Sequence, residues 1–196
     1  SSVDPTDVTD RLLDIMGSEP AVCPHLHVPL QSGDDDVLRR MNRRYTGGVF
    51  EAVVARARAR VSDHAVTSDV IVGFPGEDEQ AFESTMALCR RVGFSRLHVF
   101  QYSRRRGTVA AGLAGQVVRE EKQRRSERLI ALGRELALKF HGGLLGQVVH
   151  VLVEQSHDVA CEGLTGNYVR VVASRRAGDE GLSASPGAIV AVRVTE

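Results

Sequence analysis

The stretch HVPLQSGDDDVLRRMNRRYT, residues 27–46, decides the fold. Its first residues complete an apolar run over residues 23–30, and this run predicts a buried strand. The polar turn PLQSG follows. Three consecutive acids then open a helix predicted over residues 34–43, because carboxylates favour the positive end of a helix. The order strand, turn, helix is typical of parallel α/β domains, which bind small molecules at the carboxyl ends of their strands.

The same alternation extends on both sides of this stretch. The predicted elements are helix 4–16 before it, and after it helix 49–61, strand 65–74, helix 77–92, strand 97–102, loop 103–115 and helix 119–141. This is the pattern of an α/β fold with a parallel sheet. Three strands are too few to close an eight-stranded barrel, so we expect the natural domain to extend before residue 1. A small three-stranded open sheet is the alternative.

The pattern changes after Gly143. Short valine-rich runs over residues 148–154, 168–173 and 188–194 alternate with the turn-forming stretches EGLTGN, AGDEG and ASPG. This spacing predicts a small antiparallel β-barrel or sandwich. We therefore divide the chain into a parallel α/β part, residues 1–141, and a small β domain, residues 142–196.

The composition narrows the class of protein. The chain has 196 residues, of which 42% are hydrophobic, so it can form a sizeable core. It contains no run of about 18 apolar residues, and its polar start is unlike a signal peptide, so we expect no membrane partner and a cytoplasmic location. Three widely spaced cysteines, Cys23, Cys89 and Cys161, argue against a disulfide framework.

Charge is distributed unevenly along the chain, although the formal net charge is zero. Residues 1–95 carry 10 Lys/Arg and 15 Asp/Glu, whereas residues 96–176 carry 14 and 7. A basic middle predicts a surface that faces a polyanion. A solvated helix face of mixed charge is the alternative.

Three polar turns follow the predicted strands. PLQSG contains Gln31 and Ser32, DVIVGFPGE contains Gly73 and Gly76, and QYSRRRGT begins at Gln101. The two glycines allow the backbone to approach a flat ligand such as adenine closely. Since no Walker pattern is present, a nucleoside triphosphate is disfavoured. Together the turns predict a ligand site at one rim of the sheet, with ordinary strand-to-helix turns as the alternative.

Two further groups of residues have a chemistry of their own. Cys23, His25 and His27 alternate along a strand and so share one face, which suits a metal trio, but histidines stacked inside a barrel are the favoured interpretation. No metal ligand and no catalytic residue is therefore assigned. The run 104–106 of arginines beside Tyr102 suits RNA phosphates and a stacked base, with solvated loop charge as the alternative.

A family resemblance covers nearly the whole chain. CPHLHVPLQSGDDDVLRRMNRRYT, DVIVGFPGE and YSRRRGT, in this order, closely resemble the radical S-adenosylmethionine (SAM) methylthiotransferases. HVFQYSRRRGTVAAGLAGQV looks most like the MtaB branch, which methylthiolates N6-threonylcarbamoyladenosine at position 37 of tRNA. Other branches (MiaB and RimO) act on isopentenyladenosine and on a ribosomal protein. The last 50 or so residues resemble the TRAM domain, which grips tRNA in this family.

The resemblance also implies what is missing from the chain. Family members hold two [4Fe–4S] clusters, one by three cysteines of an N-terminal domain and one by a C-x3-C-x2-C motif of the barrel. Neither cysteine trio occurs in this sequence. The chain therefore resembles the C-terminal half of the enzyme, a partial TIM-like barrel followed by TRAM, with the cluster ligands outside it. We expect this chain alone to be inactive.

Site residues are implied by the same resemblance. The SAM-binding residues would be Gln31, Ser32, Arg43, Ile71, Gly73 and Phe74. The substrate- and RNA-binding residues would be Tyr102, Ser103, Arg105, Thr108, Asn167, Tyr168 and Arg170. The implied partners are SAM, the anticodon loop of tRNA and an external reductant, while the oligomeric state stays open. Gln101 and Asp34 depart from the family pattern.

Two other classes of protein remain as alternatives. A non-enzymatic RNA-binding module derived from this family would bind tRNA without SAM. A different α/β enzyme, such as a phosphate-sugar aldolase, would need a reactive lysine at a strand end. Lys122 and Lys139 are the lysines of this chain, and both fall on the long helix predicted over residues 119–141, which disfavours the aldolase.

Overall fold

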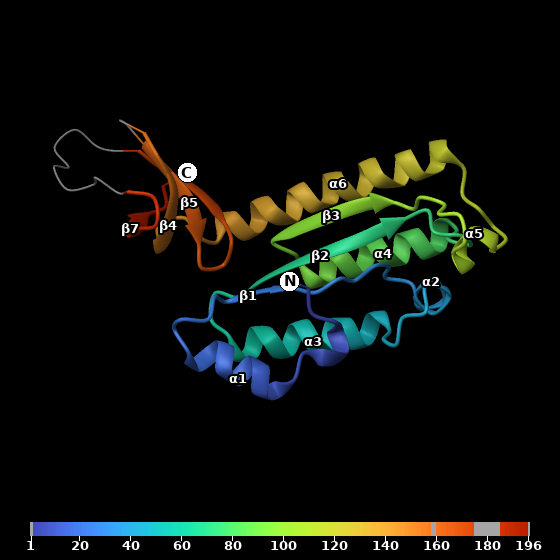
Figure 1. The fold of residues 1–196 in the computed structure, drawn as a ribbon, viewed down its shortest axis with the longest axis horizontal. Helices are drawn as coiled ribbons and strands as arrows, with labels where there is room; N and C mark the ends of the chain where they lie inside the picture. Colours follow the sequence, from blue (N-terminus) through green and yellow to red (C-terminus); the bar gives the residue numbers. More distant parts are fainter. Residues whose placement is uncertain (1, 158–159, 175–184, 196) are drawn as a thin grey trace.

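The computed structural model describes residues 2–157, 160–174 and 185–195, and it contains two sheets (Figure 1). The first is a parallel sheet in the order β1-β2-β3, formed by β1 (His25–His27), β2 (Ala65–Val72) and β3 (Arg96–Gln101). Its helices are η1 (Pro5–Asp7), α1 (Asp10–Ser18), α2 (Asp35–Arg40), α3 (Gly47–Arg60), α4 (Glu79–Val92), α5 (Val109–Gly112) and α6 (Arg119–Gly142). The predicted parallel α/β pattern is confirmed.

The parallel sheet has one face against helices and one more open face. Along β2, Val66, Val70 and Val72 are buried in the main core, whereas Asp69 and Ile71 are half-buried on the opposite side. Successive residues of a strand point to opposite faces, so the alternation in β2 fixes which side the helices cover. Large, fully buried side chains come from the covering helices, among them Phe50 from α3, Phe82 from α4 and Leu129 from α6.

Local signals explain where the helices begin and end. Asp34, Thr46 and Asp78 each cap a helix, accepting hydrogen bonds from the backbone N–H groups of Val37, Val49 and Ala81. Such caps satisfy N–H groups that have no partner within the helix. Gly93 ends α4 in the left-handed conformation at φ 65°, which favours glycine.

Several predicted boundaries are wrong in detail. The helix expected over residues 4–16 is two elements, because Thr9 caps α1 at Leu12 and the preceding turn is η1. The strand expected over residues 23–30 pairs with β2 over His25–His27, followed by an isolated bridge between Gln31 and Val70. The loop expected over residues 103–115 contains the short helix α5.

The second sheet is antiparallel, in the order β6-β5-β4-β7, and lies beyond the C-terminal end of α6 (Figure 1). Its strands are β4 (Val148–Ser156), β5 (Ala160–Thr165), β6 (Arg170–Ser174) and β7 (Ile189–Arg193). The described strands leave β6 and β7 as edges, so the expected closure into a barrel is not formed by them. The turn predicted at AGDEG lies outside the described residues.

The stretch EGLTGN, predicted as a turn, is largely the strand β5. Gly163 lies in its middle, where a Cβ atom would come within 2.0 Å of the Leu152 carbonyl oxygen. The neighbouring strand β4 has an irregularity in register between Val153 and Gln155. The close approach of the Leu152 carbonyl accounts for a glycine inside a strand.

Among the described residues, no helix combines the length and the apolar character needed to cross a membrane.

Candidate functional site

The turn PLQSG is joined to β2 at the carboxyl end of the sheet. Gln31 has φ 63°, donates its backbone N–H to the Asp69 carbonyl at 2.9 Å and accepts from the Ile71 N–H at 2.9 Å. The structure therefore brings together Gln31 and Ile71, two of the residues implied for SAM. The side chain of Ile71 is half-buried on the more open face of the sheet.

Ser32 lies next in the turn, but its hydroxyl is used inside the fold. Ser32 is fully buried, its Oγ lies 3.3 Å from Thr85 Oγ1, and it accepts a hydrogen bond from the Asp34 N–H. Thr85 also accepts from the Gly33 N–H at 2.9 Å. These bonds tie the turn to α4, so Ser32 shapes the rim from behind rather than lining it.

The turn GFPGE is held by a buried ion pair. Glu77 Oε1 accepts from the Gly73 N–H at 2.8 Å and from Arg125 Nη1 at 2.7 Å. The side chains of both partners are buried. Burial raises the pKa of the Glu77 carboxyl, while the Gly73 amide and the Arg125 guanidinium oppose that rise. Glu77 is thus the residue that fixes the turn.

The two glycines of this turn have backbone conformations that other residues adopt rarely. Gly73 has φ 72°, and a Cβ atom on it would lie 2.1 Å from Lys122 Cγ. Gly76 has φ 83°, and a Cβ atom there would lie 1.4 Å from Arg40 Nη1. The close approach that the sequence predicts is therefore made by side chains of the chain itself.

Phe74 and Tyr102 pack together between the second and third rim turns. Their rings meet edge to face at 5.2 Å, and Phe74 is buried. The Tyr102 hydroxyl is buried without a hydrogen-bond partner among the described residues. Lys122 donates from Nζ to the Tyr102 carbonyl at 3.1 Å. Sequence reasoning did not place Lys122 at the rim, although its position one turn into the helix after the third rim turn was an available signal.

The rim offers two groups that suit a cofactor with the polarity of SAM. The unpartnered Tyr102 hydroxyl supplies a polar group that a bound molecule would satisfy, and Ile71 supplies an apolar surface beside Gln31. Arg43 is exposed after α2, whereas Gly73 and Phe74 contribute buried backbone and packing. The residues fit SAM less uniformly than the sequence predicts, because Ser32 and Phe74 are used in internal contacts.

The cysteines do not form a cluster site. Cys23 is exposed before β1, Cys89 is buried in α4 and Cys161 is buried in β5. Burial raises the pKa of the Cys89 thiol to about 12, which keeps it protonated. The three cysteines therefore lie apart and do not form a shared ligand set for an iron–sulfur cluster.

The residues predicted to contact RNA lie at opposite ends of the parallel sheet. Ser103, Arg105 and Thr108 are exposed between β3 and α5, at the carboxyl end. Arg170 is the first residue of β6 and Tyr168 lies in the turn before it, in the antiparallel sheet region at the amino end (Figure 1). The 24 residues of α6 connect these ends, which corresponds to about 36 Å at the rise of an α-helix. The seven predicted residues do not form one compact site.

At the amino end, the three predicted residues have different surroundings. Tyr168 is 57% exposed, yet its ring stacks on His25 at a centroid distance of 4.3 Å. Arg170 is exposed and pairs with Glu154 at 3.0 Å. Asn167 is buried, donating to the Asp63 carbonyl and accepting from the Thr165 hydroxyl. Asn167 thus joins the turn before β6 to the loop between α3 and β2, whereas Tyr168 and Arg170 remain accessible.

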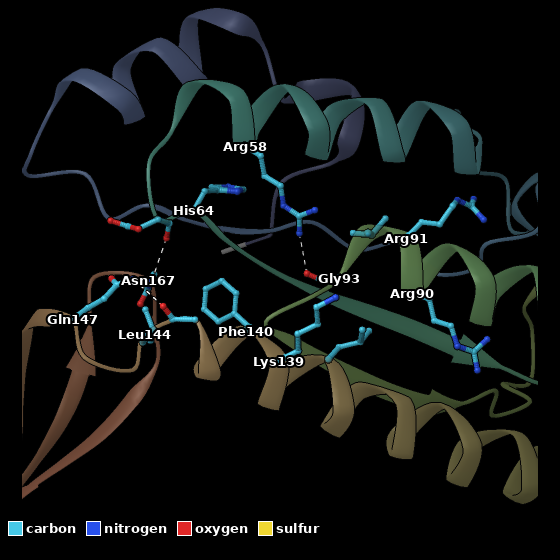
Figure 2. Close-up of a pocket in the computed structure, with 14 residues that line it drawn as sticks. Arg58, His64, Arg90, Arg91, Gly93, Lys139, Phe140, Leu144, Gln147 and Asn167 are labelled. Atoms are coloured by element: carbon cyan, nitrogen blue, oxygen red, sulfur yellow. Dashed lines mark hydrogen bonds between the residues drawn. The ribbon is translucent and has the colours of Figure 1, made fainter. Parts of the chain in front are cut away.

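A basic cavity of about 460 Å³ lies near this junction, between α3, α4, α6 and the loop before β4 (Figure 2). Arg58, Arg90 and Lys139 contribute positive charge from three different helices. Arg58 donates to the Gly93 carbonyl at 2.8 Å, whereas Arg90 and Lys139 have no ion-pair partner among the described residues. Of these three residues, Lys139 belongs to the basic middle of the sequence, residues 96–176, whereas Arg58 and Arg90 come from the part before it.

His64 borders the same cavity. It is 6% exposed, and neither ring nitrogen has a hydrogen-bond partner in the described part of the chain. Burial lowers the pKa of His64 to about 4, with further lowering from the charge of Arg58 and from His25. His64 is therefore neutral near pH 7.

The more open face of the parallel sheet carries a group of ionisable side chains. His27 and His98 flank Asp69, with His27 Nε2 at 3.3 Å from Asp69 Oδ2 and His98 Nδ1 at 3.1 Å from Asp69 Oδ1. His25 and His27 each lie within 3.0 Å of Thr67 Oγ1. The alternation along the strand placed His25 and His27 on one face as predicted, but their neighbours come from β2 and β3, and Cys23 is not among them.

Comparison with known proteins places this fold beside one family of enzymes. Residues 2–89 match the family described as the Radical SAM superfamily. Among solved structures, the chain is similar to Escherichia coli coproporphyrinogen III oxidase, described as a radical SAM enzyme, with a TM-score of 0.59 and 18% identity over 84% of this chain and 44% of that chain. This second likeness concerns the fold.

More specific relatives cover the whole chain. It is 41% identical over 201 residues to the tRNA-2-methylthio-N(6)-dimethylallyladenosine synthase of Mycobacterium ulcerans, covering 100% of this chain and 37% of that protein. It is 42% identical over 200 residues to the synthase of the same name from Frankia alni, covering 100% and 40%. The chain is thus similar to these synthases over its whole length and spans about two fifths of theirs.

Proposed function

We propose that this chain is the later part of a radical SAM methylthiotransferase, which adds a methylthio group to C2 of an N6-modified adenosine in tRNA. The similarity over 100% of the chain to synthases of that name carries the proposal. The parallel sheet with its three rim turns supports it, because a parallel sheet presents a bound cofactor at the carboxyl ends of its strands.

The N6 substituent is the finer question. The names of the relatives favour dimethylallyladenosine. The segment HVFQYSRRRGTVAAGLAGQV, residues 98–117, favours N6-threonylcarbamoyladenosine at position 37 of tRNA, in the anticodon loop. We propose dimethylallyladenosine as the first substrate to test and threonylcarbamoyladenosine as the second.

SAM would lie along the rim formed by Gln31, Ile71 and the backbone of Gly73, with the Tyr102 hydroxyl available to a polar group. When bound at a reduced iron–sulfur cluster, SAM supplies the radical that this class of enzyme uses. The cluster ligands and the external reductant would come from outside this chain, so the isolated chain is inactive. The residues of this chain would bind SAM and orient it.

RNA would contact both ends of the molecule. Residues 142–196 would form a TRAM-type domain whose exposed Tyr168 and Arg170 offer a stacking surface and a cation. The cavity lined by Arg58, Arg90 and Lys139 would hold backbone phosphate beside it. Ser103 and Arg105 would contact the nucleotide at the rim, about one α6 length away. A cytoplasmic location follows from this substrate.

A chimera tests the proposal directly. The corresponding C-terminal segment of the Mycobacterium ulcerans synthase is replaced by this chain and expressed in a bacterial strain that lacks its own tRNA methylthiotransferases. Mass spectrometry of digested tRNA then reports 2-methylthio nucleosides. We expect 2-methylthio-N6-dimethylallyladenosine to reappear, and the appearance of the threonylcarbamoyl derivative instead would assign the second substrate.

Two variants test whether product formation by the chimera depends on the proposed SAM site. Ile71→Asp places a charge on the face where the adenine of SAM would lie, so we expect no product, while Ile71→Val should retain it. A soluble chimera that contains its iron–sulfur clusters and forms neither 2-methylthio nucleoside would contradict the proposed function.

A further inference from the structure

The group on the open face of the parallel sheet has the composition of a metal site. His27, Asp69 and His98 each offer one ligand atom, and these atoms all lie within 4.8 Å of one another. The three residues come from three neighbouring strands, β1, β2 and β3. Asp69 is directly paired with His98, and His27 is paired with Thr67, two residues before Asp69. Register alone therefore brings the three side chains together.

The distances are those of a coordination sphere. Nitrogen and oxygen ligands at about 2.0–2.2 Å from a metal ion lie about 2.8–3.6 Å from each other in octahedral or tetrahedral geometry. Two distances fall in that range, 3.3 Å from His27 Nε2 to Asp69 Oδ2 and 3.1 Å from His98 Nδ1 to Asp69 Oδ1. They end on different carboxylate oxygens, so an ion would be held by both oxygens of Asp69, and the His98 side chain, which is 40% exposed, would move to complete the third edge.

A second layer of contacts orients His27. Its Nδ1 lies 2.9 Å from Thr67 Oγ1, which leaves Nε2 directed at Asp69. Thr67 Oγ1 is in turn 3.0 Å from His25 Nε2, and the His25 ring stacks on Tyr168. Metal-bound histidines commonly use their second ring nitrogen in this way, which fixes the ring orientation and the tautomer.

The group is accessible from a cavity of about 650 Å³ on the same face, which is also lined by Cys23, Phe100 and Tyr168. The side chains of His27 and Asp69 are 20% and 29% exposed. An ion can therefore enter, and positions that the three residues do not fill would face the cavity. Three protein ligands with an open position are typical of metal sites that bind a further small ligand.

We propose that His27, Asp69 and His98 bind a divalent transition-metal ion of the zinc type. Two imidazoles and one carboxylate favour zinc, cobalt or iron(II) over magnesium and calcium, which prefer all-oxygen ligands. This site is separate from the iron–sulfur clusters of the proposed function, because its three ligands include no cysteine. Its binding test requires neither SAM nor tRNA.

The experiment uses the purified full chain, freed of its affinity tag and of metal. Calorimetry with Zn²⁺ measures stoichiometry and affinity, and the visible spectrum of added Co²⁺ reports coordination by nitrogen and oxygen. We expect one ion per chain, a thermal midpoint that rises with Zn²⁺, and a loss of at least tenfold in affinity in Asp69→Asn and in His98→Gln. His98 is partly exposed, so its replacement preserves the fold and keeps the test decisive.

Three outcomes overturn the proposal. One is the absence of Zn²⁺ and Co²⁺ binding, in which case Asp69 and the two histidines form hydrogen bonds with one another and bind no metal. Another is binding that His150→Ala, an exposed control on β4, weakens as much as His98→Gln does. The third is binding that survives Asp69→Asn but is lost in Cys23→Ser, which would place the ion on the alternating residues Cys23, His25 and His27.

Discussion

The two ends of the three-stranded parallel sheet treat buried polar groups in different ways. At the carboxyl end, the buried Glu77 carboxylate is matched by Arg125 and by the Gly73 amide. At the amino end, the buried His64 ring has no hydrogen-bond partner among the described residues and borders a cavity rich in cations. A buried charge costs several kcal/mol unless it is paired, whereas a buried histidine avoids that cost by remaining neutral. The ion pair at the carboxyl end thus stabilises one conformation of its turn. At the amino end, the protonation of His64 makes the stability of the fold depend on pH.

Breaking the ion pair gives the largest expected effect. Arg125→Met leaves Glu77 buried beside the Gly73 amide without its cation. We expect a loss of about 3–5 kcal/mol in the free energy of unfolding, measured by urea denaturation, because removing one partner strands the other charge. The turn GFPGE should loosen with it, since Glu77 fixes Gly73.

Arg124→Met is the matched control for this change. It removes the same charge from the neighbouring position of α6, where the guanidinium pairs with Glu79 and Glu121 at the surface. Exposed pairs contribute little, so this variant should unfold close to the original chain. Adding Glu77→Gln to Arg125→Met should restore part of the lost stability. Equal destabilisation by both arginine variants would show that the carboxyl end gains nothing specific from its pair.

The sequence predicts the parts of this fold that follow from patterns along the chain, and it does not predict those that depend on contacts between distant segments. The helices and the three parallel strands follow from periodicity along the chain, and the caps at Asp34 and Thr46 are visible as sequence signals. The strand β5 is not predicted, because Gly163 resembles a turn residue until the Leu152 backbone is placed against it. Propensity describes a segment alone, whereas pairing selects residues for their neighbours.

The candidate sites show the same limit. The rim turns are predictable, since each is a contiguous motif after a strand. The buried roles of Ser32 and Phe74 are not, because their partners Thr85 and Tyr102 lie on other elements. The grouping of His27 with Asp69 and His98 likewise depends on strand register, which a single sequence does not reveal.

Protonation of His64 tests the amino end and should give an intermediate effect. Its pKa is about 4 in the folded chain, below the ordinary histidine pKa of 6.5. The unfolded chain therefore binds a proton first as the pH falls, so stability present above pH 6.5 is lost on the way down to pH 4. Linkage gives a loss of about 2–3 kcal/mol over that range. Urea denaturation at a series of pH values measures it.

His64→Phe supplies the comparison, because phenylalanine fills a similar space without titrating. This variant should lose less stability between pH 6.5 and pH 4 than the original chain does, by the same 2–3 kcal/mol. His150→Ala, on the exposed surface of β4, should leave the pH profile unchanged. Parallel profiles for His64→Phe and the original chain would mean that acid acts elsewhere, and the contrast between the two ends would lose its basis.

The smallest effect is expected at Tyr102, the polar group at the carboxyl end that differs from Glu77 in having no partner in the described part of the chain. Its hydroxyl is buried without a partner among the described residues, next to Phe74 and Lys122. Tyr102→Phe removes that group and keeps the ring, so we expect the unfolding free energy to stay level or to rise by up to about 1 kcal/mol. SAM affinity, measured by calorimetry on the same two proteins, should fall if the hydroxyl is kept for a ligand. A variant that is less stable and binds SAM unchanged would instead show that the hydroxyl is already satisfied within the fold and does not contact SAM.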